Sequence, residues 1–278
     1  MTFTHDPAAL TAFIQTLARH ALPLFLATLA MVLVVVAVLW LLGARYGLRR
    51  EDSRLPPVAY LALYLVLGFA VIAGAAAGFA EIAEALGDGE QLGRLDLLFS
   101  DTVRDTISLP VLRVFALLTH LGDPIVLGVI CVVVGLTLLW QRQWLLAAGW
   151  GFGIVGNAVL NTTLKHIFER TRPVHDHGLA MADGFSFPSG HASGSLVVYA
   201  MLAYVLVRRL PPQWPAGARL GAVLLAAAAA FTTGSSRVFL QVHFATDVMA
   251  GFASGTAWLA LTIGSLELLR WHSARRTG

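Results

Sequence analysis

Long apolar runs alternate with short polar segments along almost the whole chain of 278 residues. Most runs approach or exceed the roughly 20 residues that a helix needs to cross the hydrocarbon core of a bilayer. Because lipid cannot satisfy free backbone groups, such runs predict membrane-spanning helices. The pattern predicts spans at residues 21–43, 58–79, 124–140, 144–164, 191–207, 218–235 and 243–266.

The composition agrees with this pattern. Hydrophobic residues make up 57% of the chain and charged residues only 13%, and the mean hydropathy is +0.74. These values exclude an ordinary soluble globular protein and predict an all-α, polytopic transmembrane bundle. The first run is too long for the apolar region of a signal peptide, so we expect it to be a permanent helix.

The distribution of basic residues predicts the orientation of the bundle. With the N-terminus outside, the inner loops hold most of the basic residues, as the positive-inside rule favours. These inner residues are Arg45, Arg49, Arg50, Arg54, Arg142, Arg208, Arg209, Arg219, Arg270, Arg275 and Arg276. Four others, Lys165, Arg170, Arg172 and Arg237, fall in outer segments. The rule does not account for these four, so we expect a local role for them.

Several features favour packing over chemistry. The lone Cys131 lies within an apolar run and permits no internal disulfide. Residues 80–109 mix acids with apolar residues and predict an amphipathic segment on the outer surface, for which a solvated cap is the simpler interpretation. The Gly-x-Gly-x-x-Gly match at 151–156 lies inside a span and therefore predicts no nucleotide site. The pairs Gly149/Gly153 and Gly251/Gly255 instead predict close helix approach.

The first polar segment with candidate chemistry begins at Lys165, the only lysine in the chain. An ammonium suits a phosphate oxygen in a tight pocket, and Arg172 adds a planar fork of donors. Asn157, Asn161 and Lys165 follow a spacing of four residues and share one helix face. Alternatively, the asparagines join helices and the lysine extends to the interface.

The second segment is Pro188-Ser189-Gly190-His191, which precedes an apolar run. A helix that begins here would direct free N–H groups and its positive dipole end toward an anion. Gly190 would allow the backbone to approach that anion closely, and His191 would lie in the first turn as a proton donor. The alternative is a simple N-cap by Ser189 beside an interfacial histidine.

The third segment joins the last two spans and contains Arg237, His243 and Asp247. His243 and Asp247 are four residues apart, so on the entering helix the carboxylate can hold one ring nitrogen and leave the other free to attack. A carboxylate within the membrane is costly without such a partner. A purely structural His–Asp pair is the alternative, which the arginine in the same segment disfavours.

Together, the segments K-x6-R-P at 165–173, P-S-G-H at 188–191 and S-R-x5-H-x3-D at 236–247 resemble the three-part signature of the type 2 phosphatidic acid phosphatase (PAP2) superfamily. Every signature position is filled, in the usual order. The resemblance implies a six-helix phosphatase core at residues 58–266. An N-terminal tail and extra transmembrane helix at 1–57 would precede it, and a basic cytoplasmic tail at 267–278 would follow.

The resemblance also implies a role for each residue. His243 is expected to attack phosphorus, oriented by Asp247, and His191 to protonate the leaving oxygen and then activate water. The residues expected to bind the phosphate are Lys165, Arg172, Ser189, Gly190 and Arg237.

No cofactor and no metal is expected. His175, Asp176 and His177 could supply metal ligands, but three adjacent side chains rarely converge on one ion. Asp183 and Phe185 are expected to shape the mouth of the pocket.

Because all three segments lie at the predicted outer ends of their spans, we expect the phosphate to belong to a lipid headgroup. We therefore expect an enzyme of a bacterial cytoplasmic membrane, with its site facing the periplasm or the exterior. Undecaprenyl diphosphate is the leading candidate; phosphatidylglycerol phosphate, phosphatidic acid and lipid A phosphates are alternatives. Two other functions remain as alternatives: a lipid phosphotransferase, and a non-enzymatic transporter or binding protein. A transporter or binding protein would not need both histidines and Asp247. Soluble haloperoxidases share the signature, but the composition argues against them.

Overall fold

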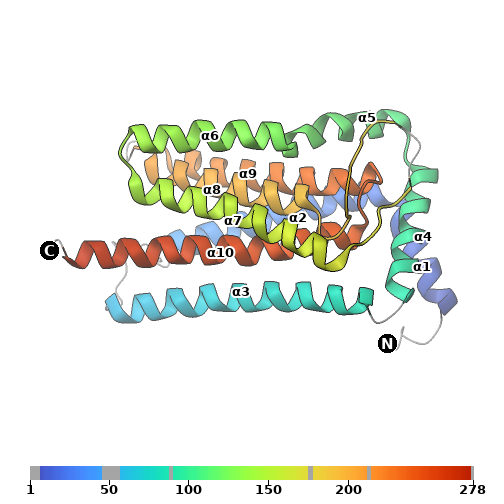
Figure 1. Ribbon diagram of the computed structural model, residues 1–278, viewed down its shortest axis with the longest axis horizontal. Coiled ribbons are helices and arrows are strands. Elements are labelled where there is room, and N and C mark those ends of the chain that lie inside the picture. The colour runs from blue at the N-terminus through green and yellow to red at the C-terminus, as the bar shows by residue number, and fades with distance from the viewer. Residues whose placement is uncertain (1–6, 46–56, 88–89, 175–177, 212–213, 277–278) are drawn as a thin grey trace.

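The computed structural model describes residues 7–45, 57–87, 90–174, 178–211 and 214–276 (Figure 1). Within these ranges the regular secondary structure is helical. The elements are α1 (Pro7–Arg19), α2 (Ala21–Arg45), α3 (Pro57–Gly87), α4 (Glu90–Thr106), α5 (Leu109–Leu118), the 3-10 helix η1 (Thr119–Gly122), α6 (Pro124–Trp140), α7 (Trp144–Phe168), α8 (Gly190–Arg209), α9 (Ala216–Phe239) and α10 (Ala245–Arg276).

Seven helical segments of the described residues are long and apolar enough to cross a membrane. They are Ala21–Gly43, Leu61–Gly87, Leu109–Trp140, Trp144–Phe168, Gly190–Arg209, Gly217–Phe239 and Ala245–Ser273. The predicted all-α transmembrane bundle is therefore confirmed. The third segment begins earlier than predicted, because α5 starts after Ser108 with a proline in its first turn and continues through η1 into α6.

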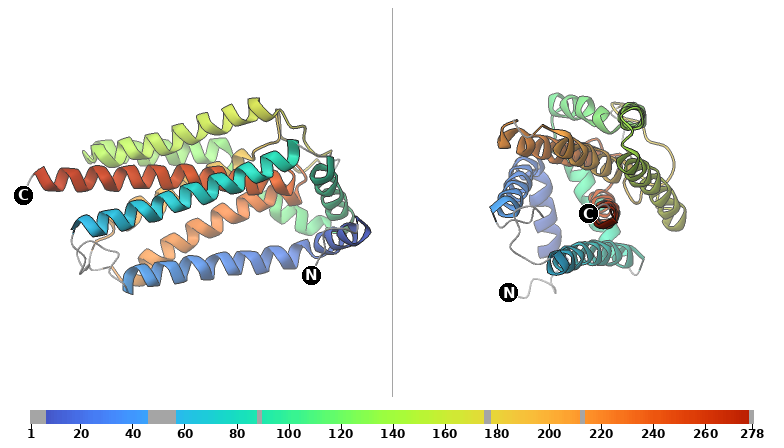
Figure 2. Two further views of the ribbon diagram at one scale, coloured as in Figure 1. Left: turned by 90° about the horizontal axis from the view of Figure 1, so that it is seen from below. Right: turned by 90° about the vertical axis from the view of Figure 1, so that its left-hand side faces the viewer.

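Helices α7 to α10 form the centre of the bundle. Helix α8 packs against α9, α10 and α7, while α3 packs along α10 and α2 along α9. The end-on view in Figure 2 shows α10 inside the arrangement, with α2 and α3 toward its periphery. As a result, the helices that carry the predicted site residues each pack against several other helices.

Glycines allow these central helices to approach closely, as the sequence predicts. A Cβ built on Gly149 of α7 would lie 2.4 Å from Leu266 of α10. A Cβ on Gly251 of α10 would lie 2.6 Å from the carbonyl oxygen of Ser189. The second contact brings the backbone of α10 directly against the segment that begins α8.

The N-terminal region contains one helix that the sequence pattern does not predict. Helix α1 packs against α4, and α2 follows it after His20. Both contribute to an apolar cluster with residues of α4, α5 and the turn after α9. Its buried members are Ala18, Ala21, Val103, Phe115, Phe239, Leu240 and Val242. The added N-terminal helices therefore support the turn that leads to His243.

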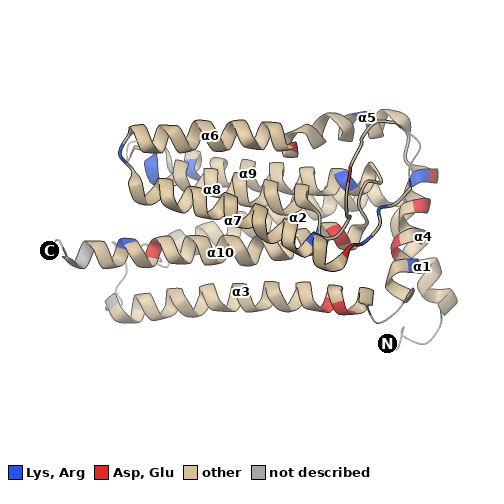
Figure 3. Ribbon diagram, in the orientation of Figure 1, with Lys and Arg blue, Asp and Glu red and all other residues tan. Residues whose placement is uncertain are grey.

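Charged residues occur mainly toward the two ends of the bundle, with a long region almost free of them between (Figure 3). Helix α4 crosses one end and carries several acids of the predicted amphipathic segment. Residues 267–276, predicted as a basic tail, continue α10. Arg49, Arg50 and Arg54 of the predicted inner loops lie outside the described residues.

Candidate active site

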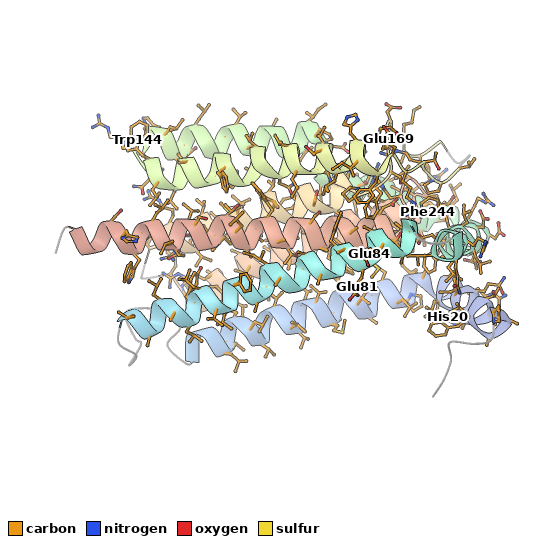
Figure 4. The ribbon with its side chains drawn as sticks, turned by 60° about the horizontal axis from the view of Figure 1, so that its bottom comes forward. His20, Glu81, Glu84, Trp144, Glu169 and Phe244 are labelled. Carbon is orange, nitrogen blue, oxygen red and sulfur yellow. The ribbon has the colours of Figure 1, made fainter. Side chains whose placement is uncertain are left out.

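The three polar segments meet at one end of the bundle. In Figure 4, Glu169, which follows α7, and Phe244, which precedes α10, lie toward the same end, whereas Trp144 at the start of α7 lies at the other. The same end carries α1 and α4 (Figure 1). Side chains far apart in the sequence thus form one polar cluster, as the direct contact between Arg172 and His243, 71 residues apart, shows.

The first segment supplies two cations to this cluster. Lys165, in the last turn of α7, donates to the backbone carbonyl of Phe185. Arg172 donates to the side chain of His243. It also donates, at 2.7–3.1 Å, to the backbone carbonyls of Asp183, Gly184, Phe185 and Val242. Burial lowers the pKa of Arg172, but a guanidinium remains charged at neutral pH. The loop predicted to shape the pocket therefore holds both cations through its carbonyl groups.

The second segment forms the start of α8. Ser189 is the N-cap, and its Oγ accepts from the backbone N–H of Ala192 at 3.4 Å. Asn161 donates to the hydroxyl of Ser193 at 3.2 Å and lies 3.1 Å from the position of a Cβ built on Gly190. The predicted polar stripe on α7 thus reaches the start of α8 and fixes its position.

His191 lies in the first turn of α8, as predicted, and its side chain is 18% exposed. Its Nε2 lies 3.4 Å from Oδ1 of Asp123, which immediately precedes α6. The start of α8 therefore has both an N-cap formed by Ser189 and a partly exposed histidine, His191.

The third segment places His243 and Asp247 in contact, with one correction to the prediction. Helix α10 begins at Ala245, so His243 lies just before the helix and only Asp247 lies within its first turn. Asp247 Oδ2 accepts from the backbone N–H of Phe244 at 2.9 Å, as the acid of a capping box does. The same oxygen lies 3.4 Å from Nδ1 of His243 and accepts from Ser186 Oγ at 2.5 Å.

These contacts determine the tautomer of His243. Arg172 Nη1 lies 3.0 Å from Nε2 of His243, and a guanidinium can only donate. Nε2 must therefore accept, and Nδ1 carries the proton that faces Asp247. Burial lowers the pKa of His243 to about 3, so the ring is neutral at neutral pH. The result is an imidazole whose Nε2 lone pair is directed at a cation that can bind phosphate.

Arg237 lies in the last turn of α9 and is only 3% exposed. Its Nη1 donates to Thr119 Oγ1 of η1 at 2.9 Å. Its buried Nε has no hydrogen-bond partner among the described residues. One donor of a buried cation therefore remains available for an oxygen of a ligand.

The prediction gives no specific role to Arg170, which the structure places at the centre of the network. Its guanidinium donates to Asp247 Oδ1 at 2.6 Å, to Asp96 Oδ2 at 2.8 Å and to Thr246 Oγ1 at 2.8 Å. It also lies 4.2 Å from the ring centroid of Phe244. The one available signal is its position among the four basic residues in the predicted outer segments; nothing in the sequence indicates Asp96 as its partner.

His175, Asp176 and His177, considered above as metal ligands, lie outside the described residues. In the remainder of the chain that the structure describes, no group of three or more His, Cys, Asp or Glu side chains could hold a metal ion.

Comparison with known proteins agrees with this geometry. The model of the PAP2 superfamily matches residues 144–271, which contain all three segments. Phosphatidylglycerophosphatase B of Bacillus subtilis (strain 168) is 34% identical over 164 residues, which cover 55% of this chain and 74% of that protein. The chain belongs to the PAP2 superfamily. It is accordingly an integral membrane phosphatase, and the resemblance read from the signature is confirmed.

A solved PAP2 structure supports the same fold. The crystal structure of a transmembrane PAP2-type phosphatidylglycerolphosphate phosphatase from Bacillus subtilis matches with a TM-score of 0.62 and 29% identity. The match covers 70% of this chain and 96% of the other. The match to the PAP2 superfamily begins at the first residue of α7, so helices α1 to α6 lie outside the matched residues.

Proposed function

We propose that this PAP2 enzyme hydrolyses the terminal phosphate of a membrane lipid through a phosphohistidine at His243, and that its substrate is phosphatidylglycerol phosphate. The neutral imidazole of His243, held between Asp247 and Arg172, is the observation that carries the proposal. A nucleophile requires an available lone pair, and this arrangement places one at Nε2.

The reaction has two displacement steps. Nε2 of His243 bonds to phosphorus while the bond from phosphorus to the leaving oxygen breaks, and His191 gives a proton to that oxygen. Water then attacks the phosphohistidine, His191 takes a proton from the water, and the N–P bond breaks to release phosphate. Asp247 stabilises the charge that develops on the ring of His243 and remains ionised itself. The scheme contains no metal or cofactor.

The cationic groups bind the phosphate. Arg172 already contacts Nε2, so an incoming phosphate oxygen would lie between this guanidinium and the nucleophile. Lys165 and Arg237 add positive charge near Arg172. At the start of α8, the backbone N–H of Gly190 is the donor that we propose for the phosphate, because the N–H of Ser189 donates to the carbonyl of Asp247. Such donors stabilise the charge on the equatorial oxygens during transfer.

The substrate is inferred from the position of the site and from the relatives. The site lies at the ends of four candidate membrane spans, where a lipid headgroup would lie. The names of the B. subtilis relatives favour phosphatidylglycerol phosphate over undecaprenyl diphosphate, the leading candidate from sequence alone. We further propose that residues 58–266 form the phosphatase core and that the site faces the periplasm or the exterior of a bacterial cytoplasmic membrane.

Phosphate release by the purified protein in detergent tests the proposal. We expect release from phosphatidylglycerol phosphate at an unchanged rate in EDTA, with slower release from undecaprenyl diphosphate. His243→Ala should lower the rate by about 10³-fold or more, because the nucleophile is removed. His272→Ala, a change at an exposed histidine near the end of α10 that is remote from Asp247, is the matched control.

Wild-type turnover in His243→Ala would contradict the mechanism. A dependence on added metal would contradict the metal-free scheme. Recovery of the phosphate in a second lipid would identify a phosphotransferase instead, and faster release from undecaprenyl diphosphate would reverse the substrate assignment.

A further inference from the structure

The 3-10 helix η1 lies against both helices that carry the proposed phosphate-binding and acid groups. Its Thr119 accepts from Arg237 of α9 at 2.9 Å. The carbonyl of Leu121 accepts from the hydroxyl of Tyr199 of α8 at 2.6 Å. None of the three signature segments includes η1, yet it is hydrogen-bonded to α9 through a side chain and to α8 through a backbone carbonyl.

Gly122, the last residue of η1, allows this backbone to contact the ring of His191. A Cβ built on Gly122 would lie 2.2 Å from Thr233 Cγ2 and 3.0 Å from His191 Cδ2. A larger residue would have to displace one of these side chains. The close approach places the next residue, Asp123, beside the imidazole.

Asp123 contacts two histidines through separate oxygens. Its Oδ1 lies 3.4 Å from Nε2 of His191, and its Oδ2 lies 2.6 Å from Nδ1 of His120. The charged groups that act on the ring of His191 are the carboxylate of Asp123 and the guanidinium groups of Arg237 and Arg172. Asp123 is the acid among these three.

We propose that Asp123 is a positioning residue that holds the proton donor of the phosphatase reaction, His191, in its working orientation. With Nε2–H directed at Asp123, Nδ1 is the nitrogen presented to the leaving oxygen. His120 fixes the carboxylate from the other side. This inference rests on the proposed role of His191 as the general acid.

The proton accounting is complete within this arrangement. The proposal requires His191 to be protonated once the negatively charged phosphate is bound beside it. As the N–P bond to His243 forms and the bond from phosphorus to the leaving oxygen breaks, the Nδ1 proton of this imidazolium moves to that oxygen. The neutral ring keeps its Nε2 proton, which remains hydrogen-bonded to the carboxylate of Asp123. In the second step Nδ1 accepts a proton from the attacking water, and the imidazolium is restored. Asp123 stays ionised throughout, as the carboxylate of a catalytic triad does.

Leaving-group dependence distinguishes this role from a structural one. Decyl phosphate expels an alkoxide, which needs a proton, whereas 4-decyl-2-nitrophenyl phosphate expels a stabilised phenolate, which does not. We expect Asp123→Asn to lower kcat/KM for decyl phosphate by about ten- to a hundredfold, because kcat/KM reports the steps up to formation of the phosphohistidine, where the leaving oxygen is protonated. The kcat/KM of the nitrophenyl compound should remain within about threefold, because a general acid assists a poor leaving group most. Asp123→Glu, which keeps the carboxylate, should recover part of the lost rate.

Control variants separate this inference from the proposal on which it rests. His191→Ala should show the same selectivity for the leaving group to a larger degree, and Asp101→Asn, at an exposed acid of α4, should change neither rate. If His191→Ala shows the selectivity and Asp123→Asn slows both substrates equally or neither, the inference about Asp123 is wrong. If His191→Ala itself lacks the selectivity, the general-acid role of His191 fails, and the role of Asp123 with it.

Discussion

Arg170 lies between two buried carboxylates and donates to both. Asp96 is 5% exposed and Asp247 is fully buried, so each requires a counter-charge. The planar guanidinium serves both at once, at 2.8 Å and 2.6 Å. Because Asp247 in turn holds Nδ1 of His243, Arg170 fixes the carboxylate that orients the proposed nucleophile.

We expect Arg170→Lys to lower kcat for the lipid substrate by about ten- to a hundredfold, which corresponds to the loss of one hydrogen bond to a charged group. An ammonium keeps the charge but lacks the fork that spans both acids. Steady-state phosphate release measures the effect. Arg104→Lys, at a partly exposed arginine of α4, is the control. Equal rates in wild type and Arg170→Lys would show that Asp247 does not depend on this bridge.

At the scale of helices, the crossing of α8 and α10 sets the position of the signature segment at 188–191. The closest atom to a Cβ on Gly251 is the backbone oxygen of Ser189, at 2.6 Å. The backbone N–H of Ser189 also donates to the carbonyl of Asp247 at 2.9 Å. The second and third segments are therefore joined through main-chain atoms, which a side-chain rotation cannot relieve.

We expect Gly251→Ala to destabilise the protein by about 1–3 kcal/mol through overpacking and to lower kcat, because Ser189 must move. Gly264→Ala lies on the same helix, where a Cβ would meet nothing within 4 Å, and should change neither property. Thermal unfolding in detergent and phosphate release measure the two effects. Identical behaviour of the two variants would show that the crossing tolerates a methyl group.

At the scale of the whole molecule, the site and the loop between α6 and α7 lie toward opposite ends of the bundle (Figures 1 and 4). From the positive-inside rule, we propose that the site faces the outside. Glu169 and Arg142 are exposed residues toward the two ends, and both already have positive φ angles, of 46° and 56°. A cysteine at either position therefore adds no new type of backbone strain.

In a Cys131→Ser background, we expect a membrane-impermeant maleimide to label Glu169→Cys in intact bacterial cells. Arg142→Cys should be labelled only after the membrane is permeabilised. The reverse pattern would place the active site on the cytoplasmic side and would contradict the proposed localisation. Labelling of both variants in detergent serves as the control for reactivity.

The sequence by itself determined the features that depend on local spacing. Apolar run lengths indicate the spans, because a lipid-embedded backbone must be helical. A spacing of four residues places Asn161 and Lys165 on one helix face. Asp247, in the first turn of α10, lies within reach of His243 just before that helix. Ser189 caps a helix through atoms three residues away. All of these relations involve neighbours along the chain.

Only the tertiary structure decided which distant side chains complete the site. Asp96 is 74 residues from Arg170 in the sequence, Asp123 is 68 from His191, and Thr119 is 118 from Arg237. These contacts arise where separate helices cross, and helix crossings depend on side-chain packing across interfaces, which has no local period. For the same reason the sequence indicated the signature residues, Asp247 among them, but not the roles of Asp96 and Asp123.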